Sequence, residues 1–340
     1  MDSILNLTPE QLELVVKEHG QPKYRAGQIH KLLMNGCRSF DEMTNLPKSF
    51  REQLSKEYDI YKPQILSKNV SEIDGTIKYL WQLRDGNAVE TVLMKYEYGN
   101  SVCISTQVGC RQGCVFCAST IGGLVRNLEP FEMYDEVLFT QLDSGCKINN
   151  IVLMGIGEPL DNYENVIAFL NKVNHPDGLN IGMRHITLST CGLYEKIDAL
   201  ADLDLQITLS LSLHSPFNES RTKIMPSNRN TGLDNIISSC KRYYDKTGRR
   251  ISLEYAMIDS VNDSEEYAIK LSEIAKKLSA HVNLIPLNYV KERELKPSTP
   301  ENMKKFTKIL DSNKVNYTIR RKLGEDVDAS CGQLRRKFLK

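Results

Sequence analysis

The segment Thr106-Gln-Val-Gly-Cys-Arg-Gln-Gly-Cys-Val-Phe-Cys-Ala-Ser-Thr120 places three cysteines within eight residues. They are Cys110, Cys114 and Cys117, separated by three residues and then by two. The preceding run, residues 102–106, is rich in β-branched side chains, which is typical of a strand. One loop at the end of a strand therefore offers three thiolates, and this spacing predicts a metal centre.

The number of thiols bears on which metal they hold. A structural zinc site is closed by four ligands, and no fourth Cys or His stands near the loop in the sequence. An iron–sulfur cubane held by three cysteines instead leaves one iron open to a small molecule. Zinc with a distant fourth ligand, such as Cys331 or His214, is the alternative that the spacing leaves open.

Short β-branched runs recur along the rest of the chain, separated by stretches long enough for a helix. The strand candidates are residues 102–106, 151–154, 186–189, 207–213, 251–255 and 282–285. The amphipathic helix candidates between them include residues 132–138, 163–170 and 265–271. Repeated strand–helix units predict an α/β fold with right-handed crossovers. Six repeats are too few for a closed eight-stranded barrel, so a partial barrel or an open sheet is expected.

Two further segments precede this repeat. Residues 1–75 carry two helix starts, at Pro9 and after Pro47, and we expect them to form a helical accessory domain. Residues 76–100 contain two strand-like runs around a Gly-Asn turn, which predicts a β-hairpin extension. Residues 101–340 then make up the main domain.

The composition is that of a soluble globular protein. Of 340 residues, 41% are hydrophobic and 26% charged, and no apolar run is long enough to span a membrane. The N-terminus does not resemble a secretory signal, so a cytoplasmic location is expected, and nine cysteines, an odd number, argue against a disulfide framework. Because the net charge is only +1, nucleic-acid contacts must use local patches. The candidate basic runs are Lys23 with Arg25, Arg249-Arg250, residues 320–322 and residues 335–337.

Several motifs together resemble one family. Besides residues 106–120, they are Arg126-Asn-Leu128, Met154-Gly-Ile-Gly-Glu-Pro-Leu160, Leu188-Ser-Thr-Cys-Gly192, Ser212-Leu-His-Ser-Pro216, Asn283-Leu-Ile-Pro-Leu-Asn288 and Asp328-Ala-Ser-Cys-Gly-Gln-Leu334. The cysteine motif, placed after the first strand of a six-fold repeat, is similar to that of the radical S-adenosylmethionine (SAM) superfamily. The full set resembles the RlmN/Cfr family of RNA adenosine methyltransferases over nearly the whole chain.

This resemblance implies both a fold and two cofactors. The fold is a partial (β/α)6 radical SAM barrel with the N-terminal helical domain and the hairpin extension added to it. The cofactors are a [4Fe–4S] cluster, held by Cys110, Cys114 and Cys117, and SAM, bound at the open iron. The positions that match the family's SAM contacts are Gly157, Glu158, Ser189, Ser212, Leu213, His214 and Asn288.

These positions also have a physical interpretation of their own. Ser189, residues 212–214 and Asn288 stand at the ends of the third, fourth and sixth strand candidates, where parallel barrels gather their ligands. Taken singly, each polar residue is more often a structural group at a strand end. The Gly155-Ile-Gly157 turn is not a dinucleotide fingerprint, because the third glycine is missing and Pro159 occupies the turn.

The expected chemistry favours a covalent relay. Carbon C2 of adenine is a poor nucleophile toward SAM, so a direct polar methyl transfer is disfavoured. The resemblance implies that one SAM methylates Cys331 and that a second supplies the radical which activates this methyl group. Cys103 then matches the family's resolving thiol and Glu90 its proton acceptor, although the resemblance does not divide the proton step between them. Met154 matches an active-site methionine, and core packing is an equally good reason for it.

The sequence therefore predicts a radical SAM methyltransferase that forms 2-methyladenosine in RNA. The resemblance points to adenosine 2503 of 23S rRNA and adenosine 37 of certain tRNAs, to an electron-donor protein of the flavodoxin or ferredoxin type, and to a monomer. A Cfr-type activity at adenine C8, which confers antibiotic resistance, is the nearest alternative. A non-catalytic, zinc-stapled RNA-binding protein is the alternative of another class.

Overall fold

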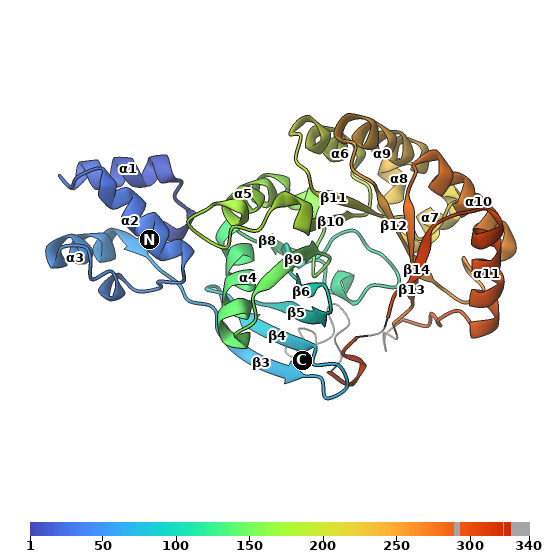
Figure 1. The fold of residues 1–340 in the computed structure, drawn as a ribbon, viewed down its shortest axis with the longest axis horizontal. Coiled ribbons are helices and arrows are strands. Elements are labelled where there is room, and N and C mark those ends of the chain that lie inside the picture. The colour runs from blue at the N-terminus through green and yellow to red at the C-terminus, as the bar shows by residue number, and fades with distance from the viewer. Residues whose placement is uncertain (289–292, 322, 328–340) are drawn as a thin grey trace.

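A computed structural model describes residues 1–288, 293–321 and 323–327 of the chain. Its centre is a ten-stranded sheet whose strand order follows the chain order without exception. The strands are β3 (Gln64–Val70), β4 (Ile77–Gln82), β5 (Ala88–Tyr96), β6 (Gly99–Cys103), β9 (Ile148–Leu153), β10 (Ile186–Thr190), β11 (Thr208–Ser212), β12 (Ser252–Met257), β13 (His281–Pro286) and β14 (Tyr317–Ile319). Figure 1 shows this sheet running through the main body of the molecule.

The strands from β6 onward form the predicted partial barrel. β6 and β9 to β14 are all parallel, and each pairs with its neighbour in the sequence. The six predicted strands correspond to β6 and β9 to β13, so the predicted repeat is confirmed, and β14 continues it at one edge. At the other edge β3, β4 and β5 are antiparallel, and β5 joins them to β6.

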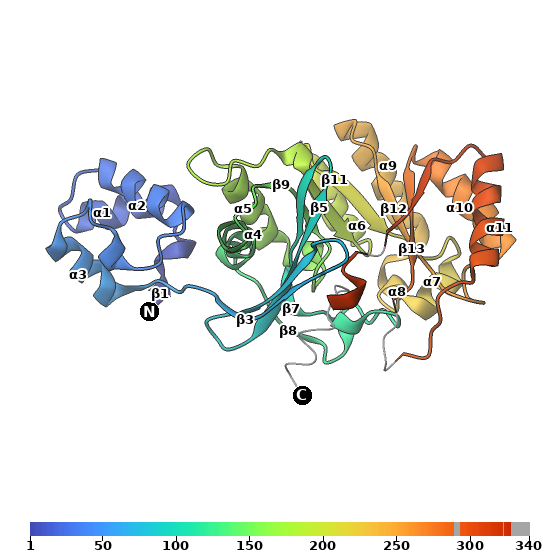
Figure 2. The same cartoon turned by 60° about the horizontal axis from the view of Figure 1, so that its bottom comes forward.

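Helices cover the outer side of the parallel strands, as Figure 2 shows. The α-helices are α1 (Pro9–Glu18), α2 (Tyr24–Met34), α3 (Lys48–Glu57), α4 (Pro130–Ser144), α5 (Tyr163–Asn174), α6 (Tyr194–Asp202), α7 (Asn218–Ile224), α8 (Asn228–Thr231), α9 (Leu233–Thr247), α10 (Glu265–Lys277) and α11 (Pro300–Ser312). Short 3₁₀ turns are η1 (Ile4–Asn6), η2 (Phe40–Glu42), η3 (Ala118–Thr120), η4 (Pro159–Asn162), η5 (Met183–His185) and η6 (Glu325–Val327). The predicted helices at residues 132–138, 163–170 and 265–271 lie inside α4, α5 and α10, respectively.

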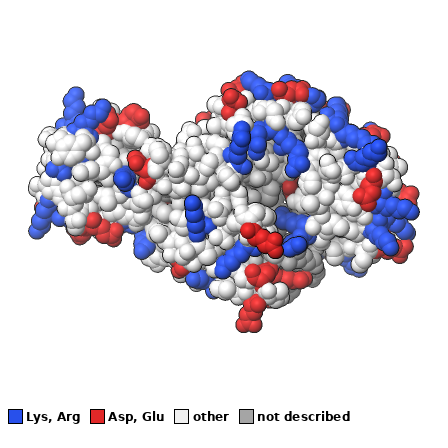
Figure 3. Space-filling view, viewed as in Figure 1, with Lys and Arg blue, Asp and Glu red and all other residues white. Residues whose placement is uncertain are grey.

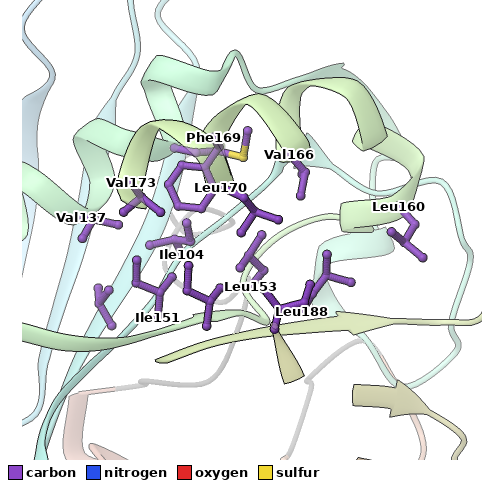
Figure 4. Packing of buried hydrophobic residues seen from close by; sticks show 14 of the residues in the cluster. Ile104, Val137, Ile151, Leu153, Leu160, Val166, Phe169, Leu170, Val173 and Leu188 are labelled. Carbon is purple, nitrogen blue, oxygen red and sulfur yellow. The ribbon is translucent and has the colours of Figure 1, made fainter. Parts of the chain in front are cut away.

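The core lies between these helices and the sheet. Figure 4 shows Val166, Phe169 and Leu170 of α5 packed over Ile151 and Leu153 of β9. All five side chains are at most 1% exposed. Such burial stabilises the barrel by roughly 1.5–3 kcal/mol for each large apolar side chain. This packing fixes where each parallel strand ends and therefore where the polar residues after it lie.

The N-terminal helices form a separate unit at one end of the molecule, as Figures 1 and 2 show. The helix predicted to start at Pro9 is α1, and Thr8 and Gln11 form a capping box at its start. A two-stranded sheet of β1 (Asp2–Ser3) and β2 (Tyr58–Asp59) brings the two ends of the unit together.

The hairpin predicted within residues 76–100 is present as β4 and β5. Residues 64–70, however, lie within the segment expected to be helical and instead form β3, which pairs with β4. The exposed fraction of its side chains does not alternate cleanly, because one side of this edge strand is not covered and a bulge interrupts it between Ile65 and Ser67. The antiparallel extension therefore has three strands instead of two.

Candidate active site

A cavity of about 260 Å³ lies at the carboxyl ends of the parallel strands. The predicted residues that line it are Cys110, Cys114, Cys117, Met154, Gly157, Glu158, Ser189, Ser212, His214 and Asn288. They come from the cysteine loop and from the ends of β9, β10, β11 and β13. Parallel strands that end at one edge bring these side chains together around one cavity.

The cysteine loop is held in place from both sides. It follows β7 (Gln107–Gly109), which pairs with β8 (Leu124–Asn127), and the Cys110 amide donates to the carbonyl of Gly123 (3.0 Å). At its other end the Val115 amide donates to the carbonyl of Ile224 (3.0 Å). Gly109 has a φ of +82°, and a Cβ there would lie 2.0 Å from the Gly123 carbonyl oxygen, so only glycine fits. The loop is thus a preformed scaffold for three thiols.

The three thiols fit a thiolate-bound cluster. Burial raises the pKa of Cys110 to about 12, and burial together with the neighbouring cysteines raises the pKa of Cys114. A bound metal reverses this tendency, because its positive charge favours the thiolate form. Three sulfurs from one loop on one cavity wall match the ligand set of a cubane with an open iron.

The turn after β9 brings Glu158 into the cavity. Gly155 passes so close to β6 that a Cβ would lie 2.4 Å from the Ile104 carbonyl oxygen. Gly157 has a φ of +115°, and a Cβ there would lie 2.8 Å from the Gln107 nitrogen. The Glu158 carboxylate accepts hydrogen bonds from the amides of Cys191 (2.7 Å) and Leu160 (3.1 Å), while burial raises its pKa. A buried, oriented carboxylate at this wall suits an ammonium group.

His214 is fixed after β11 in the left-handed region, with a φ of +52°. Its Nδ1 accepts the Ala256 amide (2.9 Å), so the neutral ring carries its proton on Nε2. Burial, with a smaller effect from Arg221, lowers its pKa to about 3. The ring packs edge-on against Phe116 of the cysteine loop, with ring centroids 4.8 Å apart. His214 is therefore a neutral hydrogen-bond donor in the cavity wall rather than a charged group.

The remaining predicted contacts divide into two kinds. Ser189 and Ser212 line the cavity and share a hydrogen bond between their hydroxyls (3.3 Å). Leu213 does not line it, because its side chain is fully buried in the core. Its amide donates to the Glu254 carbonyl (3.1 Å), and its own carbonyl accepts from Arg221 Nε (3.0 Å). Leu213 therefore supports the cavity wall from behind.

Several wall residues were missed by sequence reasoning. Glu254 of β12 lines the cavity and accepts hydrogen bonds from Ser210 (2.7 Å) and Asn283 (2.8 Å). Arg320, directly after β14, and Cys191, after β10, also line it. An acidic residue within the apolar strand 251–255 was the available signal for Glu254. Cys191 lies inside a quoted motif but resembled a structural thiol.

Cys103 and Glu90 lie beside the cavity and not in its wall. Cys103 of β6 packs with Val92 and Met94 of β5, and Met154 joins this cluster from the cavity side. Glu90 of β5 is 3% exposed and pairs with Lys78. The last predicted site residue, Cys331, lies outside the described residues.

Comparison with known proteins identifies the fold and the family. A family model described as the Radical SAM superfamily matches residues 104–271, and one described as a ribosomal RNA large subunit methyltransferase N-terminal domain matches residues 3–60. A protein of Lachnoclostridium phytofermentans named as a probable dual-specificity RNA methyltransferase RlmN is 51% identical, over 98% of this chain and 94% of its own. A relative of the same name from Alkaliphilus metalliredigens is 50% identical over 99% of this chain and 96% of its own.

The chain belongs to the RlmN family of radical SAM enzymes. A solved radical SAM methyltransferase from Sphaerobacter thermophilus superposes with a TM-score of 0.92 at 38% identity, covering 98% of this chain and 99% of that one. The predicted partial barrel with its added N-terminal domain is thereby confirmed. The chain is a methyl-transferring enzyme, and its cofactors are those of the superfamily, a [4Fe–4S] cluster and SAM. In its described part, no helix is long and apolar enough to cross a membrane.

Proposed function

We propose that this enzyme methylates carbon C2 of adenine in RNA, at adenosine 2503 of 23S rRNA and adenosine 37 of tRNAs. The observation that carries the proposal is the convergence of three thiols, a carboxylate and strand-end polar groups on one cavity. The buried Cys103 packs against Met154 of the cavity wall, and the buried Glu90 lies on the same face of the sheet. The names of the RlmN relatives and the match to a ribosomal RNA methyltransferase domain point to the same substrate class.

The residues in the cavity wall have separate roles in this proposal. Cys110, Cys114 and Cys117 hold the cluster, which supplies the electron that converts SAM into a radical source. Glu158 binds the ammonium end of SAM, and the hydroxyls of Ser189 and Ser212 and the amide of Asn288 meet its remaining polar groups. His214 donates from Nε2, with no change of charge at neutral pH. An electron-donor protein of the flavodoxin or ferredoxin type would reduce the cluster.

The methyl group passes through Cys331 before it reaches adenine. In the release step, the bond between the Cys331 sulfur and the transferred carbon breaks as a disulfide with Cys103 forms. Before this release, a base must remove the C2 proton of the adenine adduct, and one electron must leave the adduct, for which the oxidised cluster would be the acceptor. The thiol proton of Cys103 then passes to the released carbon, which becomes the methyl group. Burial raises the pKa of Cys103 to about 11, which favours the protonated thiol near neutral pH. This favours Glu90 as the base, with Cys103 as the resolving thiol.

RNA contact must come from the local charge distribution. In Figure 3, Lys and Arg side chains gather above and below the hollow in the middle of this face, although the net charge of the chain is only +1. Arg320 extends this positive charge to the cavity wall. Phosphate groups on either side of a target nucleotide would meet these side chains while the base enters the cavity.

The proposal is tested with the reconstituted enzyme under anaerobic conditions. Mass spectrometry of digested rRNA and tRNA should find 2-methyladenosine, whereas 8-methyladenosine alone would contradict it and indicate the Cfr-type reaction. Cys331→Ala should still cleave SAM to 5′-deoxyadenosine but transfer no methyl group. Methyl transfer at the wild-type rate by this variant would rule out the relay.

A further inference from the structure

An ion pair lies inside the antiparallel extension, next to the proposed base. Lys78 Nζ of β4 lies 2.9 Å from Glu90 Oε2 of β5, and the two side chains are 0% and 2% exposed. In the ladder, Lys78 stands opposite Val92, and Leu80 stands opposite Glu90. The two charged residues are therefore diagonal neighbours on one face of the sheet.

That face is the one directed toward the cavity. Glu90, Val92 and Met94 alternate along β5 and so share a face, and Val92 stands opposite Cys103. Val92, Met94 and Cys103 pack against Met154, which lines the cavity. Thr91, on the other face, donates to Glu136 of α4 (2.6 Å), which confirms that the helix side is the opposite one.

We propose that Lys78 is a positioning residue, whose ammonium group fixes the Glu90 carboxylate beside Cys103 for the step in which it accepts the adenine C2 proton. The inference rests on the proposed function of Glu90. Its physical basis is that a carboxylate removed from water without a cation takes up a proton itself and can then no longer act as a base. A buried ion pair also adds little net stability, so a role in the reaction is a better reason for it than folding.

Within the described part of the chain, the other ionisable groups near Glu90 or near its neighbour Cys103 are Cys103 itself, Glu136 and Arg320. Cys103 faces Glu90 from β6 and, with its pKa raised to about 11, is an uncharged thiol near neutral pH. Glu136 of α4 lies on the opposite face of β5, where it accepts from Thr91, and burial raises its pKa, so this carboxyl group is no substitute for a cation. Arg320, which follows the edge strand β14, is close enough to lower the pKa of Cys103, whereas the Lys78 ammonium is in direct contact with the Glu90 carboxylate.

The test separates the release step from the steps before it. Reconstituted holoenzyme carrying methylated Cys331 is mixed with SAM and RNA for a single turnover at a series of pH values. Three products are measured: 5′-deoxyadenosine, the RNA linked to Cys331 through a thioether, and released methylated RNA. Lys78→Met should cleave SAM within about twofold of wild type, accumulate the linked RNA and release product at least tenfold more slowly at pH 7.

The pH profile gives the readout that a purely structural residue would not change. For Lys78→Met, the pH at which release becomes half-maximal should rise by at least one unit, because the carboxylate now ionises only at higher pH. Lys78→Arg keeps the charge and should restore the wild-type midpoint. Lys68→Met is the matched control, since Lys68 pairs with Asp143 across β3 and α4, is 36% exposed and should leave both rate and profile unchanged.

Two further variants keep the outcomes distinguishable. If Lys78→Met does not fold, Lys78→Gln takes its place in the same assay. If Glu90→Gln releases product at the wild-type rate, the proposed role of Glu90 is wrong and Lys78 has nothing to position. If Glu90→Gln blocks release while the neutral Lys78 variants keep the wild-type midpoint, the inference about Lys78 alone is overturned.

Discussion

The protonation state of His214 is determined by its surroundings and not by its residue type. A histidine beside a cofactor cavity is usually considered as an acid or base, because its ordinary pKa lies near neutrality. Here the Ala256 amide occupies Nδ1, and burial lowers the pKa to about 3, so the ring stays neutral. The sequence placed His214 at a strand end, but its protonation state depends on contacts from β12 that no local pattern reveals.

The neutral state of His214 in the folded chain has a measurable consequence for stability. His214 must stay neutral in the folded chain but can take up a proton in the unfolded chain, whose histidine pKa is near 6.5. The contribution of neutral His214 to the free energy of unfolding is therefore fully present above pH 6.5 and is lost as the pH falls below this value. Between pH 7 and pH 5 this should lower the free energy of unfolding by about 2 kcal/mol. Urea unfolding of the reduced apo protein at both pH values measures it.

The control for this prediction is His214→Asn. Asparagine tolerates a φ near +52°, and its Oδ1 can take the place of Nδ1 as the acceptor for the Ala256 amide. Between pH 7 and pH 5, the variant should lose about 2 kcal/mol less than the wild type. An identical pH dependence in both proteins would show that His214 titrates normally in the folded chain.

Other site residues also differ in how far their role could be predicted from the sequence. The three cluster cysteines could be identified from sequence because their spacing within one loop is itself the signal. Glu254 and Arg320 could not, because their place in the cavity wall depends on β12 and β14 lying next to β11 and β13. Residues brought together by long-range packing leave little trace in a local pattern.

At the scale of elements, the turn after β9 decides whether the cavity can hold SAM. Gly157→Ala would bring a Cβ within 2.8 Å of both the Gln107 nitrogen and the Thr106 hydroxyl, so the turn must move and take Glu158 with it. We expect the reconstituted variant to bind SAM at least tenfold more weakly than wild type, as measured by equilibrium dialysis.

A substitution at a second glycine, Gly248, is the control that distinguishes crowding by the added Cβ from backbone strain at a positive φ. Gly248 ends α9 with a φ of +66° and has nothing within 4 Å of an added Cβ. Gly248→Ala should therefore destabilise the protein by about 1 kcal/mol and leave SAM binding unchanged. Wild-type affinity for SAM in Gly157→Ala would contradict the proposed role of this turn.

Strands and helices with a clear hydrophobic pattern could be predicted from the sequence, whereas the edge strand β3 could not. The parallel strands are buried and β-branched, and the helices between them are amphipathic, so both signals survive in the sequence. β3 packs at the sheet edge with most of its side chains exposed, and a bulge shifts its register. The pattern that marks a strand is therefore weak there.

At the scale of the whole molecule, a buried ion pair joins the N-terminal helices to the barrel. Arg38, in the segment after α2, pairs with Asp135 of α4, and the two side chains are 1% and 6% exposed. The guanidinium also packs over the rings of Phe131 and Phe139, with its carbon 4.5 and 5.2 Å from their centroids. Tyr134 adds a hydrogen bond to the Met34 carbonyl (2.8 Å).

Removing one member of this pair should loosen the N-terminal unit. Arg38→Met leaves the Asp135 carboxyl buried without its cation, which should lower stability by roughly 3–5 kcal/mol. Limited proteolysis should then cut within residues 58–64, between α3 and β3, while SAM cleavage continues and RNA methylation falls.

The double variant Arg38→Met with Asp135→Leu provides the control, because it removes the buried charge altogether. It should recover most of the lost stability and resist the protease like wild type. If Arg38→Met is as protease-resistant as wild type, the ion pair does not hold the two units together.

The strand order of the sheet has a consequence for how the chain folds. Because the ten strands of the main sheet, β3 to β6 and β9 to β14, pair in the order in which they are made, each new strand can add to an edge that already exists. β14 is the last of these strands to be synthesised, so Arg320 can join the cavity wall only after the loop with Cys110, Cys114 and Cys117 has been made.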